Sequence, residues 1–218
     1  MLSCASGDQA ILTAAAKGND EVICQGLLHA VNKKQGDVNL IQDNNGDKLV
    51  HILARQGRVN SLLELLKLSS DSLLIKDPNG KDPLPIASKH GQIEVVQFLL
   101  AETGTETVIL GGCDLAVKTL RSHPKVELAA QQLQSEHAVV VAACIMNNTK
   151  LTSLDLSNNQ LLGDPLNPDF TGVQALARAI HLSLNLLVVN VSGCDIGPTG
   201  VQDLVHSIKF STSMTSLK

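Results

Sequence analysis

Two stretches of the chain repeat the same pattern of glycines and apolar residues. Gly46 and Gly57 bracket a short segment in the first copy, and Gly80 and Gly91 bracket the matching segment in the second, so both glycines recur at an offset of 34. A run with apolar residues at helical spacing follows the second glycine of each pair. Repetition at a fixed period predicts a solenoid, in which each unit packs on its neighbours alone, so it constrains the fold more than any other feature.

Each unit predicts a turn, a short helix, a corner and a second helix. The turns are Asp43–Gly46 and Asp77–Gly80, where aspartate and glycine are favourable turn residues. Glycine also suits the corner, because the chain adopts positive φ there without steric cost. A corner around Gly18 indicates an earlier copy, so residues 8–103 hold about three units.

These units resemble ankyrin repeats, whose period is about 33 residues and whose first helix opens with a Thr-Pro-Leu-His-like signature. Lys48–His51 and Asp82–Pro85 occupy that position and keep the signature in part. The departures weaken the hydrogen bonds that open the helix in the family. The resemblance implies stacked helix pairs, and it gives His51 a structural role at the start of its helix instead of a role as a catalytic base.

A different repeat occupies the end of the chain. Residues 151–161 align with residues 186–196 at an offset of 35, and 172–180 align with 200–208 at an offset of 28, because the first copy carries an insertion within 162–171. Alternating leucines predict short strands with Leu154 and Leu156 facing inward. In each copy a polar residue follows the strand, Asn159 in the first and Cys194 in the second; we expect it to satisfy backbone groups where the chain bends.

This second pattern resembles the leucine-rich repeat of the ribonuclease-inhibitor type. We assign residues 137–218 to it: a helical N-terminal cover at 137–145, two full repeats, and a third that opens at 214–217. The expected fold is therefore mostly α with a small parallel β edge, built as tandem solenoids of ankyrin helix pairs followed by α/β leucine-rich repeats.

The junction, residues 104–136, has two interpretations. Residues 124–133 match 91–100 shifted by 33, which favours a degenerate fourth ankyrin unit made of helices. Alternatively, residues 108–115 echo 189–196, which indicates a degenerate leucine-rich strand. We favour the ankyrin-like helices, because their period fits and they need no long insertion before His137.

Composition and motifs exclude several function classes. The net charge is −4, which gives no basic footprint for nucleic acid, and the longest apolar run, 138–146, is too short to cross a bilayer. Five cysteines, none in a Cys-x-x-Cys pair, predict free thiols in a reducing compartment, and we expect a cytoplasmic location. With no metal, phosphate-binding or nucleophile-elbow motif, we expect no catalytic, cofactor-binding or metal site.

A repeat stack offers a long surface for binding other proteins, and in ankyrin relatives the turn tips and the residues before the corner glycine make the contacts. In the leucine-rich part, outward strand positions would do so, although that strip lacks aromatic and arginine anchors. We therefore expect the ankyrin face to bind more strongly. The predicted partner-binding residues are Asn44, Asn45, Asp47, Arg55, Gln56, Pro78, Asn79, Lys81, Lys89, His90, Ser153, Asp155, Val188 and Asn190, with Ser157 and Ser192 as further outward positions.

The last apolar layer has no capping unit within the sequence. This leads us to expect either a longer natural chain or self-association through the C-terminal edge. The sequence thus predicts a non-catalytic interaction scaffold. The alternative is a regulatory or sensor segment of a larger signalling protein whose effector domain lies beyond Lys218.

Overall fold

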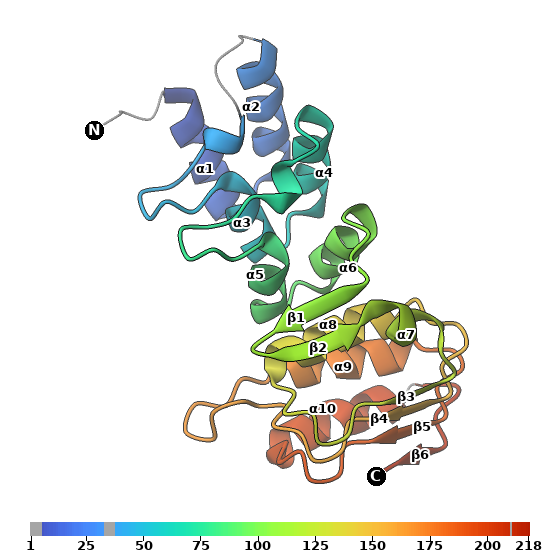
Figure 1. Cartoon of the computed structure of the whole chain (residues 1–218). Coiled ribbons are helices and arrows are strands. Elements are labelled where there is room, and N and C mark those ends of the chain that lie inside the picture. Colours follow the sequence, from blue (N-terminus) through green and yellow to red (C-terminus); the bar gives the residue numbers. More distant parts are fainter. Residues whose placement is uncertain (1–5, 33–37, 210) are drawn as a thin grey trace. The chain divides into compact units, whose positions relative to one another are not determined.

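The computed structural model describes residues 6–32, 38–209 and 211–218 (Figure 1). It divides the chain into two compact units, Met1–Thr103 and Gly104–Lys218. The described residues form many helices and one small parallel sheet, so the predicted fold class is confirmed. None of the helices in these ranges is both long enough and apolar enough to cross a membrane.

The first unit consists of helix pairs, as the repeat pattern predicts. Its core is aliphatic, with Leu53, Leu62 and Leu99 almost completely buried. At each corner the glycine has the expected positive φ, +73° at Gly57 and +68° at Gly91. The helices pair as α1 (Ser6–Lys17) with α2 (Asp20–Asn32), α3 (Leu49–Arg55) with α4 (Val59–Leu68), and α5 (Pro83–Lys89) with α6 (Ile93–Glu102); short 3-10 turns lie at Val38–Leu40 and Ser72–Leu74.

The second unit pairs a four-stranded parallel sheet with a row of helices (Figure 1). Neighbouring strands are in register, so that Leu154 lies opposite Val189 and both point into the core. Helix α9 packs between α8 and α10. The elements are β3 (Lys125–Glu127), β4 (Ser153–Asp155), β5 (Val188–Asn190) and β6 (Ser216–Leu217), with α8 (Ser135–Ile145), α9 (Thr171–Leu182) and α10 (Gly197–Lys209).

The junction differs from both interpretations of the sequence. Residues 108–115, the alternative leucine-rich strand, lie in an antiparallel hairpin of β1 (Thr107–Leu110) and β2 (Cys113–Ala116). Residues 124–133, the favoured ankyrin-like helix, contain strand β3 instead, and only the short helix α7 (Val117–Ser122) precedes it. The prediction of a fourth ankyrin helix pair is therefore wrong.

Strand β3 also changes the role predicted for residues 137–145. They belong to α8, which follows strand β3 just as α9 follows strand β4. Helix α8 is therefore the helix of a repeat and not a cover for the stack. The sequence hides this repeat because His123 and Gln131 occupy the positions that Leu151 and Asn159 hold in the next repeat. Only Val126, Leu128 and Leu133 keep the apolar pattern.

Candidate functional site

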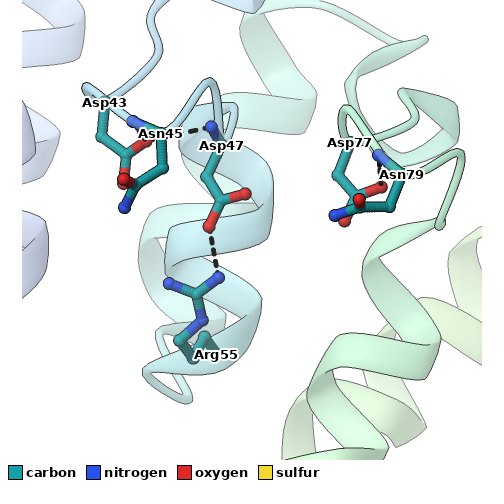
Figure 2. A network of polar contacts seen from close by, with 6 residues as sticks. All are labelled: Asp43, Asn45, Asp47, Arg55, Asp77 and Asn79. Atoms are coloured by element: carbon teal, nitrogen blue, oxygen red, sulfur yellow. Dashed lines mark hydrogen bonds and ion pairs between the residues drawn. The ribbon is translucent and has the colours of Figure 1, made fainter.

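The two ankyrin turns have the same internal geometry (Figure 2). The Asp43 carboxylate accepts hydrogen bonds from the backbone N–H of Asn45 at 2.9 Å and of Asp47 at 3.0 Å. In the next repeat the Asp77 carboxylate accepts from the N–H of Asn79 at 2.8 Å and of Lys81 at 2.7 Å. Each carboxylate therefore fixes the backbone of its own turn from inside.

The glycine of each turn completes this geometry. Gly46 and Gly80 have φ of +83° and +76°, and each donates its N–H to the carbonyl of the aspartate that begins its turn. A Cβ added at Gly46 would lie 3.0 Å from Cγ of Pro78, so the two tips are immediate neighbours. The structure thus brings the two sets of predicted tip residues together on one side of the first unit.

The charge on Asp77 is favoured by its turn. Burial raises the pKa of this carboxyl, but the hydrogen bonds from the backbone N–H of Lys81 and Asn79 outweigh that effect, and the pKa lies below its ordinary value. At neutral pH the carboxylate is ionised and the turn keeps its shape.

The tip and corner residues differ in how far solvent reaches them. Asp47, Arg55 and Gln56 are only partly exposed. The remaining predicted residues of this face are exposed: Asn44, Asn45, Pro78, Asn79, Lys81, Lys89 and His90.

Arg55 has a structural role that its position in the sequence does not reveal. Its guanidinium forms an ion pair with the Asp47 carboxylate, which ties the end of α3 to the turn before that helix (Figure 2). The backbone carbonyl of Arg55 accepts a hydrogen bond from the Gln92 side chain at 3.0 Å, which links this repeat to the next. Arg55 therefore combines a half-exposed surface with two internal contacts.

His51 lies inside the first unit, as its helix-opening position predicts. It is 0 % exposed, and its Nε2 lies 2.9 Å from the carbonyl oxygen of Ile75, to which it donates. Burial lowers the pKa of the ring, although the carbonyl of Ile75 and the charge on Asp77 oppose this. A neutral, fully enclosed imidazole connects two repeats and is closed to any substrate.

The predicted strip of the leucine-rich part lies on β4 and β5. Ser153 pairs with Val188 and Asp155 pairs with Asn190, and all four are half-buried. The Asp155 carboxylate accepts hydrogen bonds from the Ser157 hydroxyl at 2.7 Å and from the Asn190 side chain at 3.2 Å.

Those contacts favour the ionised form of the Asp155 carboxyl. The Ser157 hydroxyl is the main cause that lowers the pKa of Asp155. Ser157, predicted as a further outward position, bonds the Asp155 carboxylate of the strip but is buried, so its hydroxyl is not available to a partner. Ser192 is exposed as predicted.

The sequence missed two members of this strip. Lys125 pairs with Ser153 and Glu127 with Asp155, and both are exposed. The sequence indicated them only through the alternation of charged and apolar residues in Lys125–Leu128, and that stretch also matched an ankyrin helix. The strip therefore begins with a lysine and a glutamate on β3.

The polar residues after β4 and β5 point inward, as predicted. The Asn159 carboxamide oxygen accepts from the N–H of Gln131 and of Leu133, both at 3.0 Å, and its amide donates to the carbonyls of Leu128 and Leu156 at 2.8 and 2.7 Å. In the next repeat, Cys194 donates its thiol to the carbonyl of Leu156 at 3.0 Å.

The cysteines offer little nucleophilic chemistry. Burial raises the pKa of the Cys194 thiol, and it raises that of Cys144, which is fully buried in α8, to about 11. Cys4 lies outside the described residues. Within the described ranges, no group of three or more His, Cys, Asp or Glu side chains is placed to hold a metal ion.

Comparison with known families gives the same two repeats. Residues 11–111 match the model for ankyrin repeats in three copies, and residues 147–165 and 182–205 match the leucine-rich repeat model. Both families are general protein-protein interaction modules. The β3 repeat, which the sequence pattern hides, lies outside the matched ranges. The chain thus carries ankyrin repeats followed by leucine-rich repeats.

Proposed function

We propose that this protein is a non-catalytic scaffold that binds other proteins in the cytoplasm, mainly through its ankyrin turn tips. The observation that supports this most directly is the pair of neighbouring turns with equal geometry, each fixed by an aspartate from inside and each exposing asparagine side chains. A surface that is already ordered loses little conformational entropy when it binds, so even polar contacts give useful affinity.

The ankyrin face is proposed as the stronger binder because its side chains are more available. Asn44, Asn79, Lys81 and Lys89 are exposed. On the leucine-rich strip, by contrast, Asp155 already accepts several hydrogen bonds and is half-buried. A partner that binds there must compete with contacts already made.

The type of leucine-rich repeat is part of the proposal. Paired positions step from Lys125 to Ser153 between β3 and β4, and from Val188 to Ser216 between β5 and β6, an offset of 28 in both cases. Full helices separate the strands. This combination supports the ribonuclease-inhibitor type.

The test compares charge-reversed variants as baits for affinity capture from native lysate, with each captured protein quantified by mass spectrometry. Lys81→Glu/Lys89→Glu changes two exposed charges that form no ion pair in the described structure, whereas Arg55→Glu also breaks the contact with Asp47 and is less specific. Asp155→Lys is the matched reversal on the strip.

We expect at least a fivefold loss of the captured set with Lys81→Glu/Lys89→Glu and less than a twofold change with Asp155→Lys. Circular dichroism of each variant verifies that its fold is retained. Equal losses, or a greater loss with Asp155→Lys, would overturn the preference for the ankyrin face.

A further inference from the structure

A cavity of about 510 Å³ lies between α9 and α10. A second cavity in the same unit, of about 480 Å³, has a more unusual lining that is rich in glutamine. The hairpin tip Gly111–Cys113 forms one side, the loop residues Gln131, Gln132 and Gln134 form another, and Gln160 and His137 complete it. Its volume falls within the range of about 300–1,000 Å³ that is usual for ligand sites. Neither the ankyrin tips nor the strip on β4 and β5 includes any of these residues.

The walls of this cavity, which we name the glutamine pocket, are fixed from behind. His137 is 2 % exposed; its Nε2–H donates to the carbonyl of Leu110 at 2.9 Å, and its Nδ1 accepts from the N–H of Gln134 at 3.0 Å. These two bonds hold the hairpin to the start of α8. Because both ring nitrogens are used, His137 acts as a support for the wall.

The backbone is constrained on both sides of the pocket. Ala130 and Gln132 have positive φ of 55° and 57°, and Gly111 and Gly112 of the hairpin tip have 51° and 85°. Non-glycine residues adopt this conformation at a cost, and they keep it only where the surroundings hold them. Here Asn159 holds the loop through the N–H of Gln131 and of Leu133.

The pocket presents three carboxamides that have no partner within the described part of the protein: two on the fixed loop and that of Gln160. Among the residues that the structure describes, none forms a hydrogen bond with the side chain of Gln131, Gln132 or Gln160, and all three are exposed. A carboxamide both donates and accepts, so three of them match a ligand whose groups alternate between N–H and C=O.

The lining also excludes other ligand classes. The lining has no Asp, Glu, Lys or Arg, and burial raises the pKa of the Cys113 thiol, so an ionic ligand would find no carboxylate, ammonium or guanidinium as a counter-charge. The chain has no Trp or Tyr, so no such ring lines the pocket on which a sugar could stack.

We propose that the glutamine pocket binds a short, uncharged, extended peptide segment of a partner protein through hydrogen bonds to that segment's backbone. This assigns a ligand class to a site that the proposed function does not use. The two tests have separate residues and readouts, so either proposal can fail without the other.

The experiment is an NMR titration of the full ¹⁵N-labelled chain. The probe is a pool of N-acetylated, C-amidated tripeptides made of Gly, Ala, Ser and Asn. Matched pools place one Lys or one Asp in every tripeptide, and maltotriose serves as the sugar probe. Gln132→Ala and Gln160→Ala identify the side-chain amide signals by their loss. The backbone amide of Gly112 is a reporter that remains in every variant.

With the neutral pool we expect saturable shifts of the Gln132, Gln160 and Gly112 signals at millimolar peptide, at least threefold greater than with either charged pool. The Gln132→Ala/Gln160→Ala variant should lose at least two thirds of the Gly112 shift, whereas Gln202→Ala, at an exposed glutamine on α10, should keep it. An unchanged spectrum away from the pocket shows that each variant is folded. No shift, equal shifts with all pools, or a response to maltotriose alone would overturn the proposal.

Discussion

Replacing Asn159 by alanine should destabilise the second unit far more than the same change at Cys194, although both residues occupy the same position of their repeats. Asn159 is 2 % exposed, and its carboxamide contacts five backbone groups. An unsatisfied buried donor or acceptor costs about 1–3 kcal/mol. The N–H of Leu133 is fully enclosed and has no substitute acceptor in the described structure, so it accounts for roughly 2 kcal/mol of the loss.

The other four groups lose less. The Ser157 carbonyl, 3.3 Å from the Asn159 amide, also accepts the backbone N–H of Ala130 at 2.9 Å. The hydrogen bonds to the N–H of Gln131 and to the carbonyl of Leu128 are only part-buried, whereas the bond to Leu133 is buried, so their loss should cost less. The carbonyl of Leu156 also accepts the Cys194 thiol at 3.0 Å, and it keeps that contact in Asn159→Ala. Together they add about 1 kcal/mol, which gives a total of about 3 kcal/mol. Cys194→Ala removes one weak donor and a small side chain, so its cost should be about 1 kcal/mol.

The shared carbonyl makes the two changes interdependent. In Asn159→Ala/Cys194→Ala, the Leu156 carbonyl loses both side-chain donors, so the double variant should cost about 1 kcal/mol more than the sum of the single variants. This coupling separates the hydrogen-bond explanation from a general loss of packing, for which the two costs would simply add.

Hydrogen exchange with mass spectrometry is the suitable assay, because the chain has no Trp or Tyr for fluorescence and circular dichroism would combine both units. Peptides that cover β3 to β4 report the local free energy of opening. The reasoning is refuted if Asn159→Ala costs less than about 1 kcal/mol, if it matches Cys194→Ala, or if the double variant is additive.

Two further predictions concern pH and close packing. His51 has a lowered pKa in the folded state, so the unfolded chain gains a proton first as pH falls below about 6.5. Stability that is present above that pH is therefore lost below it. Because glutamine does not titrate, His51→Gln should lose less of its denaturant midpoint between pH 7.5 and 5 than the wild-type protein. An equal loss in the variant and the wild type would contradict this. Gly172→Ala places a Cβ 2.4 Å from the backbone oxygen of Ser135, whereas the contact at the equivalent Gly200 is 3.1 Å from Cβ of Ile196. We expect Gly172→Ala to lower the free energy of unfolding by more than about 2 kcal/mol and Gly200→Ala by less than about 1 kcal/mol. Hydrogen exchange measures both costs, and equal costs would show the packing argument to be wrong.

The sequence predicts those parts of the fold in which local chemistry and period agree. The corner glycines and the Asp43 and Asp77 turns are examples, because an aspartate that closes its own turn needs no distant partner. The inward position of Asn159 was predictable in the same way. Its five backbone partners were not, since three of them, Leu128, Gln131 and Leu133, lie in the preceding repeat.

Strand β3 could not be predicted because its repeat lacks two of the defining residues. His123 replaces the first leucine and Gln131 replaces the asparagine. What remains, Val126 and Leu128, is compatible with a strand or with the start of a helix. In the structure, pairing with β4 resolves this ambiguity, and the backbone of Ala130 donates to the carbonyl of Ser157. Contacts from the following repeat therefore supply what the local sequence lacks.

In the candidate sites, too, local features could be predicted from the sequence and features that depend on distant contacts could not. Exposure of the tips could be predicted from turn chemistry alone, but the Arg55 ion pair with Asp47 could not, since it depends on how α3 is oriented toward its own turn. The glutamine pocket was still less visible. Its members come from a hairpin tip, a loop and Gln160, which become neighbours only when the hidden β3 repeat forms.

The lack of Trp and Tyr shapes both proposals. Large aromatic anchors usually dominate binding energy at protein interfaces, and this chain can offer none of these two types. What it offers instead are carboxamides on fixed backbone: Asn45 and Asn79 above the Asp43 and Asp77 turns, and Gln132 above the Asn159 network. Because the supporting side chains have already fixed the backbone in the free protein, a partner does not have to order it. Affinity at both surfaces should therefore depend on these hidden supports as much as on the groups in contact. Asn159→Ala removes no side chain that lines the pocket, yet it should weaken the neutral-peptide response of Gly112 about as much as Gln132→Ala/Gln160→Ala does. A full response in Asn159→Ala would show that backbone order contributes nothing to binding.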